Sequence, residues 1–242
     1  ITPIICLTAY TKTIAKIADK YCDIILVGDS LGMVLYGMKT TKKVKIETMI
    51  LHCKTVKNYT KKSLVVFDMP YKTYDNKFIA YKNASRVMRL TKCDAVKLEG
   101  GKKIVNIIKY LVKKGIPVMG HVGLLPQTST NFKVKGKNFI QKKKILDDAI
   151  AISNSGVFAI VLECVVEDLA KIITKSVSVP TIGIGASKYC DGQILVSDDI
   201  LGLSDYYPKF VKKYSNLKNT VEKSVRDYAK DVKLRKFPSN KN

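Results

Sequence analysis

The sequence predicts an α/β protein built as a single closed (β/α)8 barrel, and three observations support this prediction. Eight short apolar runs recur along the 242 residues. Segments with helical periodicity separate most of these runs, which is typical of parallel strands covered on both faces. The phosphate-binding patterns G-x-G-x-x-G and G-x-x-x-x-G-K-[ST], which mark nucleotide-binding sheets, do not occur in the sequence. A barrel therefore fits better than a doubly wound sheet.

The expected strands are short runs that are apolar along almost their whole length, as in a sheet buried on both faces. They cover Ile4 to Thr8, Ile24 to Val27, Leu64 to Phe67, Ala95 to Leu98, Pro117 to Gly120, Phe158 to Leu162, Thr181 to Ile184 and, more weakly, Gln193 to Val196. In a barrel these strands run parallel, so the residues that follow them gather at one end.

The expected helices have apolar residues at spacings of three and four. They cover Thr13 to Tyr21, Lys45 to Asn58, Lys77 to Thr91, Ile104 to Val112, Lys142 to Ser155, Glu167 to Ser176 and Lys218 to Lys233. The fourth is followed by Gly115 and Pro117, a typical helix stop. No repeat or linker divides the chain, so we expect residues 1–242 to form one domain.

The net charge of +23 raises the alternative of a basic nucleic-acid-binding protein. Only four of the 43 basic residues are arginine, the residue favoured for bidentate contacts to phosphate and guanine. No nucleic-acid-binding motif is present, and no apolar stretch reaches the ~18 residues of a membrane span. We therefore expect the lysines to cover outer helix faces, with no specific nucleic-acid partner and no membrane contact.

The six cysteines lie far apart in the sequence, and several fall inside apolar runs. None has the two-residue spacing of a zinc or redox pair. We expect reduced core thiols and a cytoplasmic location.

Ionisable residues follow most of the predicted strands, at the end where barrels carry their chemistry. The strand exits read Gly28-Asp29-Ser30, Asp68-Met69-Pro70, Lys97-Leu98-Glu99-Gly100-Gly101, Gly120-His121 and Leu162-Glu163-Cys164, whereas Gly183-Ile184-Gly185 carries glycines. An aspartate after a strand is often only the N-cap of the next helix, and Lys97 with Glu99 could be only a buried ion pair. Together, however, the exits predict an active site.

The residue types at these exits indicate metal-assisted enolate chemistry. Asp29, Asp68 and Glu99 would supply oxygen ligands, which favour Mg²⁺ over zinc. A hard cation can chelate a 2-oxo acid and stabilise its enolate. Glu163 could then move the proton, because a buried carboxylate without a function or a partner is energetically costly. For His121 the sequence supports a functional role and a structural role in the core equally.

Six motifs in the same order resemble the 3-methyl-2-oxobutanoate (ketopantoate) hydroxymethyltransferase family from about Thr8 to about Phe210. They are Val27-Gly28-Asp29-Ser30-Leu31-Gly32-Met33, Asp68-Met69-Pro70-Tyr71, Val96-Lys97-Leu98-Glu99-Gly100-Gly101, Gly120-His121-Val122-Gly123-Leu124 with Pro126-Gln127, Leu162-Glu163-Cys164, and Gly183-Ile184-Gly185-Ala186 with Asp191-Gly192-Gln193.

The resemblance implies a TIM barrel that uses Mg²⁺ and belongs to a homo-oligomer, commonly a decamer. It implies transfer of a one-carbon unit from 5,10-methylenetetrahydrofolate to 3-methyl-2-oxobutanoate, which gives ketopantoate for pantothenate biosynthesis. The same resemblance implies that Asp29 and Asp68 bind the metal, with Glu99 as a further carboxylate. It implies that the oxo acid is contacted by Asp29, Ser30, Asp68 and Lys97. Glu163 would accept the proton, and His121 would lie in the substrate pocket.

The sequence departs from the family at three places: Thr11 and Ser187 stand where the family usually has Asp and Gly, and the loop from Thr128 to Gly136 is contracted. The N-terminal helix typical of the family is also expected to be missing. One further alternative is an enolate enzyme like phosphoenolpyruvate mutase or isocitrate lyase. Their K-[KR]-C-G-H loop does not occur in this sequence.

Overall fold

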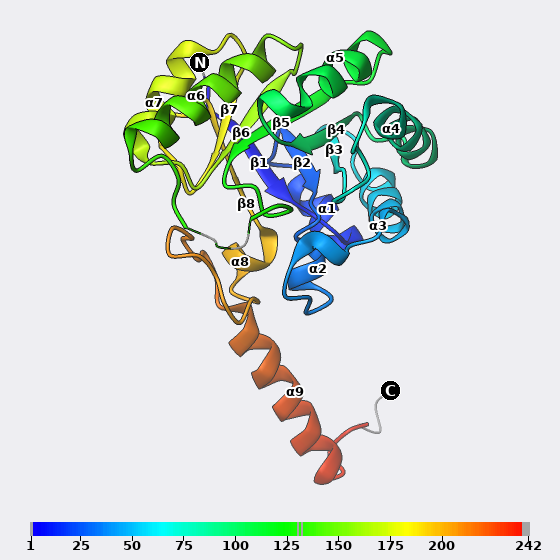
Figure 1. Cartoon of the computed structure of the whole chain (residues 1–242). Helices are drawn as coiled ribbons and strands as arrows, with labels where there is room; N and C mark the ends of the chain where they lie inside the picture. Colours follow the sequence, from blue (N-terminus) through cyan, green and yellow to red (C-terminus); the bar gives the residue numbers. More distant parts are fainter. Residues whose placement is uncertain (1, 130, 132, 239–242) are drawn as a thin grey trace. The chain divides into compact units, whose positions relative to one another are not determined.

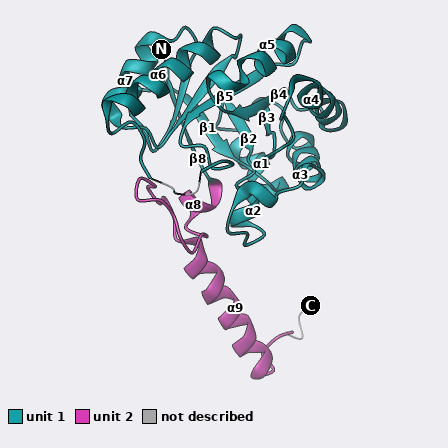
Figure 2. Ribbon diagram, viewed as in Figure 1, with its two compact units in different colours: residues 1–196 teal, residues 197–242 magenta. Residues whose placement is uncertain are grey.

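The computed structural model describes residues 2–129, 131 and 133–238. Eight parallel strands form a closed barrel in which each strand pairs with its neighbours in chain order and β8 pairs back with β1 (Figure 1). The predicted barrel is confirmed. By internal contacts the chain divides into two compact units, Ile1–Val196 and Ser197–Asn242, coloured teal and magenta in Figure 2.

The strands lie close to the apolar runs, with informative differences at their carboxyl ends. Their bounds are β1 Ile4–Thr8, β2 Ile24–Val27, β3 Leu64–Asp68, β4 Ala95–Glu99, β5 Val118–Gly123, β6 Ala159–Glu163, β7 Thr181–Ile184 and β8 Gly192–Leu195. Asp68, Glu99 and Glu163 are therefore the last residues of their strands. The expected end of β5 at Gly120 is too early, because the strand continues through His121 to Gly123 and pairs with β6 there.

Helices cover the outside of the barrel (Figure 1). The first unit contains α1 Lys12–Ala18, α2 Leu31–Val34, α3 Ile46–Asn58, α4 Lys77–Thr91, α5 Val105–Lys113, α6 Phe139–Ser153 and α7 Glu167–Ser176, with 3-10 turns η1 Thr41–Lys43 and η2 Lys102–Ile104. The sequence did not predict α2, η1 or η2, because three or four residues are too few to show a period. The helix expected at Thr13–Tyr21 is shorter, and the one expected from Lys142 begins at Phe139.

The core has two parts because successive side chains of a strand point to opposite faces of the sheet. On β4, Val96 and Leu98 face outward and join the large cluster between barrel and helices. Ala95 belongs instead to the cluster inside the barrel. The members of that inner cluster are Cys6, Ile24, Leu26, Val66, Ala95, Met119, Ala159, Val161, Ile182 and Ile194.

The second unit contains α8 Ser197–Leu201 and the 17-residue helix α9 Leu217–Lys233, none of whose residues is buried. In the described part of the chain, no helix is long and apolar enough to cross a membrane. The six cysteines are free thiols, five of them buried and Cys22 partly exposed, as expected for core residues. The assignment of residues 1–242 to one domain stays a prediction.

Candidate active site

Strand alternation turns the predicted site residues into the barrel. Lys97 and Glu99 share the inward face of β4 with Ala95, which belongs to the inner cluster. The same parity places Asp68 two residues beyond Val66, and Glu163 two residues beyond Val161. The polar residues therefore form the layer next to the carboxyl ends of the strands, above the apolar interior.

Asp29, Asp68 and Lys97 form one contact group. The Lys97 ammonium lies 2.6 Å from Asp68 Oδ1, and both side chains are almost completely buried. The backbone N–H of Asp29 donates to Asp68 Oδ2 at 3.3 Å. The two predicted metal carboxylates are thus brought together, with a lysine on one side.

Glu99, His121 and Glu163 form a second group. His121 lies between the two carboxylates, with Nδ1 3.7 Å from Glu99 Oε1 and Nε2 3.3 Å from Glu163 Oε2. Neither ring nitrogen has a hydrogen-bond partner among the described residues. The Glu163 side chain is 18% exposed and those of His121 and Glu99 at most 3%, so Glu163 is the carboxylate of this group that an incoming ligand can reach.

Gln127 joins the two groups, and sequence reasoning did not single it out. Its side-chain Nε2 donates to Asp29 Oδ2 at 2.9 Å, and its backbone N–H donates to Glu99 Oε2 at 3.1 Å. The Tyr74 hydroxyl donates to Gln127 Oε1 at 2.5 Å. In the sequence Gln127 stands only within the Pro126-Gln127 motif, and its position in a loop gives no sign of a buried role.

Ser30 lies directly after Asp29 and opens the short helix α2. Its side chain does not cap that helix. Instead its hydroxyl lies 2.7 Å from the Tyr10 hydroxyl, in the segment that follows β1.

A two-glycine turn ends β4 directly after Glu99. Gly100 has φ +140°, a conformation that L side chains rarely adopt. A Cβ on Gly101 would lie 2.0 Å from the Asp148 carboxyl carbon. That carboxylate accepts a hydrogen bond from the Lys102 N–H at 2.8 Å, so α6 fixes the turn that positions Glu99.

Burial and crowding of like charges shift the ionisation of the site. Burial first, and then the charge of Asp68, raise the pKa of Asp29 to about 7. Burial also raises the pKa of Glu99 well above its ordinary value. Burial opposes the charge of Lys97, but the surrounding carboxylates, Asp68 first, raise its pKa. Burial and the Lys97 charge lower the pKa of His121, which favours a neutral ring at pH 7.

The donor set fits a hard divalent cation. Four carboxylates, Asp29, Asp68, Glu99 and Glu163, share this layer with one buried lysine, and oxygen is the donor that Mg²⁺ prefers. The buried hydroxyl of Thr41 interacts with the Asp29 carboxylate and partly offsets the rise of its pKa. Within the same residues, no group of three or more His, Cys, Asp and Glu side chains is arranged to hold a metal ion. The predicted trio of Asp29, Asp68 and Glu99 stays a prediction.

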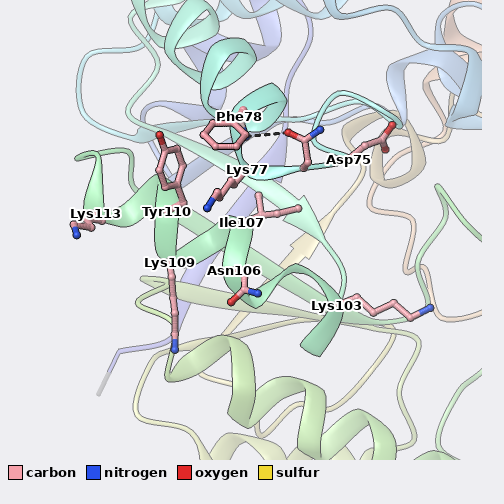
Figure 3. Close-up of a pocket in the computed structure, with 10 residues that line it drawn as sticks. Asp75, Lys77, Phe78, Lys103, Asn106, Ile107, Lys109, Tyr110 and Lys113 are labelled. Atoms are coloured by element: carbon pink, nitrogen blue, oxygen red, sulfur yellow. Dashed lines mark hydrogen bonds between the residues drawn. The ribbon is translucent and has the colours of Figure 1, made fainter.

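A separate pocket of about 600 Å³ lies between α4 and α5 on the outside of the barrel (Figure 3). Lys77, Lys103, Lys109 and Lys113 line it together with the aromatic pair Phe78 and Tyr110, but none of the predicted site residues does. The loop expected to be contracted, Thr128 to Gly136, includes Thr130 and Phe132, which lie outside the described residues.

Comparison with known proteins gives consistent matches across the chain. A model of the ketopantoate hydroxymethyltransferase family matches residues 1–240. The 3-methyl-2-oxobutanoate hydroxymethyltransferase of Pelagibacter ubique (strain HTCC1062) is 55% identical over 240 residues, which cover 99% of this chain and 93% of the relative. The Rhizobium etli protein of the same name is 52% identical over 242 residues, which cover 98% of this chain and 89% of the relative.

Solved structures with the same fold are much more distant in sequence. A phosphonopyruvate hydrolase, solved in complex with oxalate and Mg²⁺, has a TM-score of 0.63 at 12% identity over 99% of this chain and 88% of its own. A 2,3-dimethylmalate lyase of the PEP mutase/isocitrate lyase superfamily has a TM-score of 0.64 at 13% identity. The match covers 98% of this chain and 85% of the lyase. At these identities the likeness shows the fold alone.

Proposed function

The chain belongs to the ketopantoate hydroxymethyltransferase family, and from that premise we propose how its barrel carries out the family's reaction. The enzyme transfers a hydroxymethyl group to 3-methyl-2-oxobutanoate and so forms ketopantoate (2-dehydropantoate), in pantothenate biosynthesis. The one-carbon donor is 5,10-methylenetetrahydrofolate, which is consumed as a co-substrate.

Asp29 and Asp68 would hold Mg²⁺, with Glu99 as a further carboxylate near it. The support is their shared burial: the Asp29 backbone N–H bonds to the Asp68 carboxylate, and two buried carboxylates on residues in contact, with a single lysine beside them, are costly without a further cation. When bound, Mg²⁺ polarises the keto oxygen of the substrate and stabilises the negative charge that develops on it.

Lys97, Asp29, Asp68 and Ser30 orient the oxo acid. Lys97 stays protonated at neutral pH, since the carboxylates around it raise its pKa, and its charge offsets the anionic substrate. The Ser30 hydroxyl, already aligned by Tyr10, provides a polar contact at the strand exit.

Glu163 accepts the proton from C3 of the oxo acid. Its greater exposure supports this role, since the base must reach a bound substrate. The electron pair released from the C–H bond forms the new bond between C3 and the methylene carbon, and the two bonds from that carbon to the folate nitrogens break. Water supplies the hydroxyl group, and the two nitrogens of the departing tetrahydrofolate take up the second proton of the water and the proton removed from C3. His121, held between Glu163 and Glu99, restricts where the Glu163 carboxylate lies.

The observation that carries this proposal is the layer of buried carboxylates around Lys97, with Glu163 as its accessible member. Incubation with Mg²⁺, 5,10-methylenetetrahydrofolate and 3-methyl-2-oxobutanoate should give ketopantoate, and omission of any one of the three should prevent it. Product that forms equally well after chelation of Mg²⁺ would contradict the metal assignment. An absence of product with all three present would contradict the proposed reaction.

We place the enzyme in the cytoplasm as a homo-oligomer, and by family resemblance as a decamer. Its free, mostly buried cysteines agree with a reducing compartment. Sedimentation analysis of the purified chain tests the decamer.

A further inference from the structure

We infer that Gln127 is a positioning residue that fixes the Asp29 carboxylate, and with it Glu99, for cation binding. The inference rests on the proposed metal site and adds to it a residue outside the predicted set. Gln127 lies in the connection from β5 to α6, 98 residues away from Asp29, and it is 1% exposed.

All the hydrogen-bonding groups of the Gln127 side-chain amide are used. Nε2 donates to Asp29 Oδ2 and to the carbonyl oxygen of Met69, each at 2.9 Å. Oε1 accepts the bond from the Tyr74 hydroxyl at 2.5 Å. An amide has two N–H donors and one carbonyl, so no group is left over.

The direction of this amide follows from its neighbours. If it were reversed, Oε1 would face the Met69 carbonyl and the ionised Asp29 carboxylate to which a cation binds, and three acceptors would meet without a proton. The Tyr74 hydroxyl accepts a bond from the Glu99 N–H at 3.3 Å. Its own proton has two acceptors within reach, and Gln127 Oε1 at 2.5 Å is much nearer than the Glu99 carbonyl oxygen at 3.5 Å. Tyr74 therefore holds the NH₂ group of Gln127 toward Asp29.

The backbone of Gln127 extends the same arrangement to a second strand exit. Its N–H donates to Glu99 Oε2 at 3.1 Å. One residue thus holds the carboxylate that follows β2 and the carboxylate that ends β4. Bonds to charged acceptors are stronger than neutral ones, and such outer partners orient the groups that bind a metal.

Titration of the metal-free protein with Mg²⁺, followed by calorimetry without substrates, tests this role apart from turnover. In Gln127→Met the side chain keeps its approximate length but loses the donor, and we expect Mg²⁺ to bind about 10- to 100-fold more weakly. The matched control is Gln141→Met. It removes a side-chain bond to the Gly136 N–H in the same connection but does not touch the site, so Mg²⁺ affinity should stay at the wild-type value.

Tyr74→Phe provides a second measurement if Gln127→Met does not fold. It leaves the amide in place but removes the proton that fixes its direction, so we expect a smaller loss of Mg²⁺ affinity. In the double variant the two losses should not add, because Tyr74 acts through Gln127.

Wild-type Mg²⁺ affinity in Gln127→Met, or in Tyr74→Phe where the first does not fold, would overturn the inference and leave Gln127 as an anchor of its loop. Asp29→Asn separates this result from failure of the metal site. If Asp29→Asn loses Mg²⁺ binding and Gln127→Met does not, only the inference fails. If Asp29→Asn also binds Mg²⁺ normally, the metal assignment fails and the inference with it.

Discussion

Two neighbouring layers of the barrel interior are chemically opposite, although most of the residues in both are buried. Val66, Met119 and Val161 form part of the apolar layer, and two residues further along the same strands come Asp68, His121 and Glu163. Along each of these strands, the inward-facing side chain therefore changes from apolar to ionisable over two residues. Position along the strand, rather than depth of burial, decides which inward residues can do chemistry. The following predictions test this division.

Asp68→Asn should have the largest effect, because we propose Asp68 for both the metal site and the substrate site and it is paired with Lys97. Metal activation supplies several kcal/mol of barrier reduction, and each 1.36 kcal/mol is tenfold in rate. We expect turnover on the order of 10⁴-fold lower, measured as ketopantoate formed. EDTA treatment of the wild-type protein should have a comparable effect. Near-normal turnover in either case would show that the polar layer at the carboxyl ends of the strands does not take part in catalysis.

Glu163→Gln should slow proton exchange at C3 of 3-methyl-2-oxobutanoate by about 10²- to 10⁴-fold, the usual cost of losing a general base. The amide has nearly the same shape but cannot accept the proton, so oxo-acid binding should persist. Deuterium incorporation, followed by NMR without folate, isolates this step. Wild-type exchange would move the base elsewhere, with His121 the first group to examine.

Ile182→Ala tests the apolar layer. Ile182 is completely buried in β7, whose exit carries glycines instead of ionisable residues. Removing its branched side chain should lower the free energy of unfolding by about 2–5 kcal/mol, as for other large-to-small core changes. The kcat of the folded fraction should stay close to wild type. A large drop in kcat with little loss of stability would show that the two layers are not functionally separate.

The pH dependence of the free energy of unfolding should reveal how far the buried carboxylates of the polar layer destabilise the metal-free protein. Because the pKa of Asp29 is raised to about 7, the folded state holds this proton more tightly than the unfolded chain, whose Asp pKa is about 3.9. Stability should therefore fall as pH rises through this window and level off above about 7. We expect a Tm at least about 2–4 °C higher at pH 5.5 than at pH 7.5, since 1 kcal/mol produces such a shift in a domain of this size.

Asp29→Asn is the control for this measurement, since it should reduce the difference between the two pH values. Saturating Mg²⁺ should do the same by stabilising the ionised form at pH 7.5. An equal pH slope in the variant would assign the effect to other groups, with Glu99 the next to test.

The smallest effect is expected from the outer lysines. Lys102 forms an exposed ion pair with Asp147, and Lys109 and Lys113 line the pocket between α4 and α5, away from the site. Exposed pairs contribute at most about 1 kcal/mol, so changing all three lysines to Gln should leave ketopantoate synthesis within about twofold. Weak nucleic-acid binding should fade with salt, because it depends on counterion release. Selective binding near physiological salt that this triple variant loses would make the exterior a functional surface.

Periodicity and strand exits predicted most of the fold and the candidate carboxylates, because both depend on local sequence order. The short helix Leu31–Val34 was missed since it is barely one turn long and contains Gly32. Gln127 was missed for a different reason. Gln127 lies in a loop, and it is buried against Asp29 and Tyr74 only because the closed barrel brings these distant segments together. No local sequence pattern predicts such contacts.

Closure of the barrel has a consequence for how the chain folds during synthesis. Ile4 pairs with Gly192, so β1 acquires its second neighbour only after almost the whole barrel has been made. At about 5–20 residues per second, roughly 10 to 40 seconds separate the two strands at the ribosome, and during this time one edge of β1 has no partner. Open edges of this kind promote aggregation. The net charge of +23 on the complete chain makes its copies repel one another, which opposes such association.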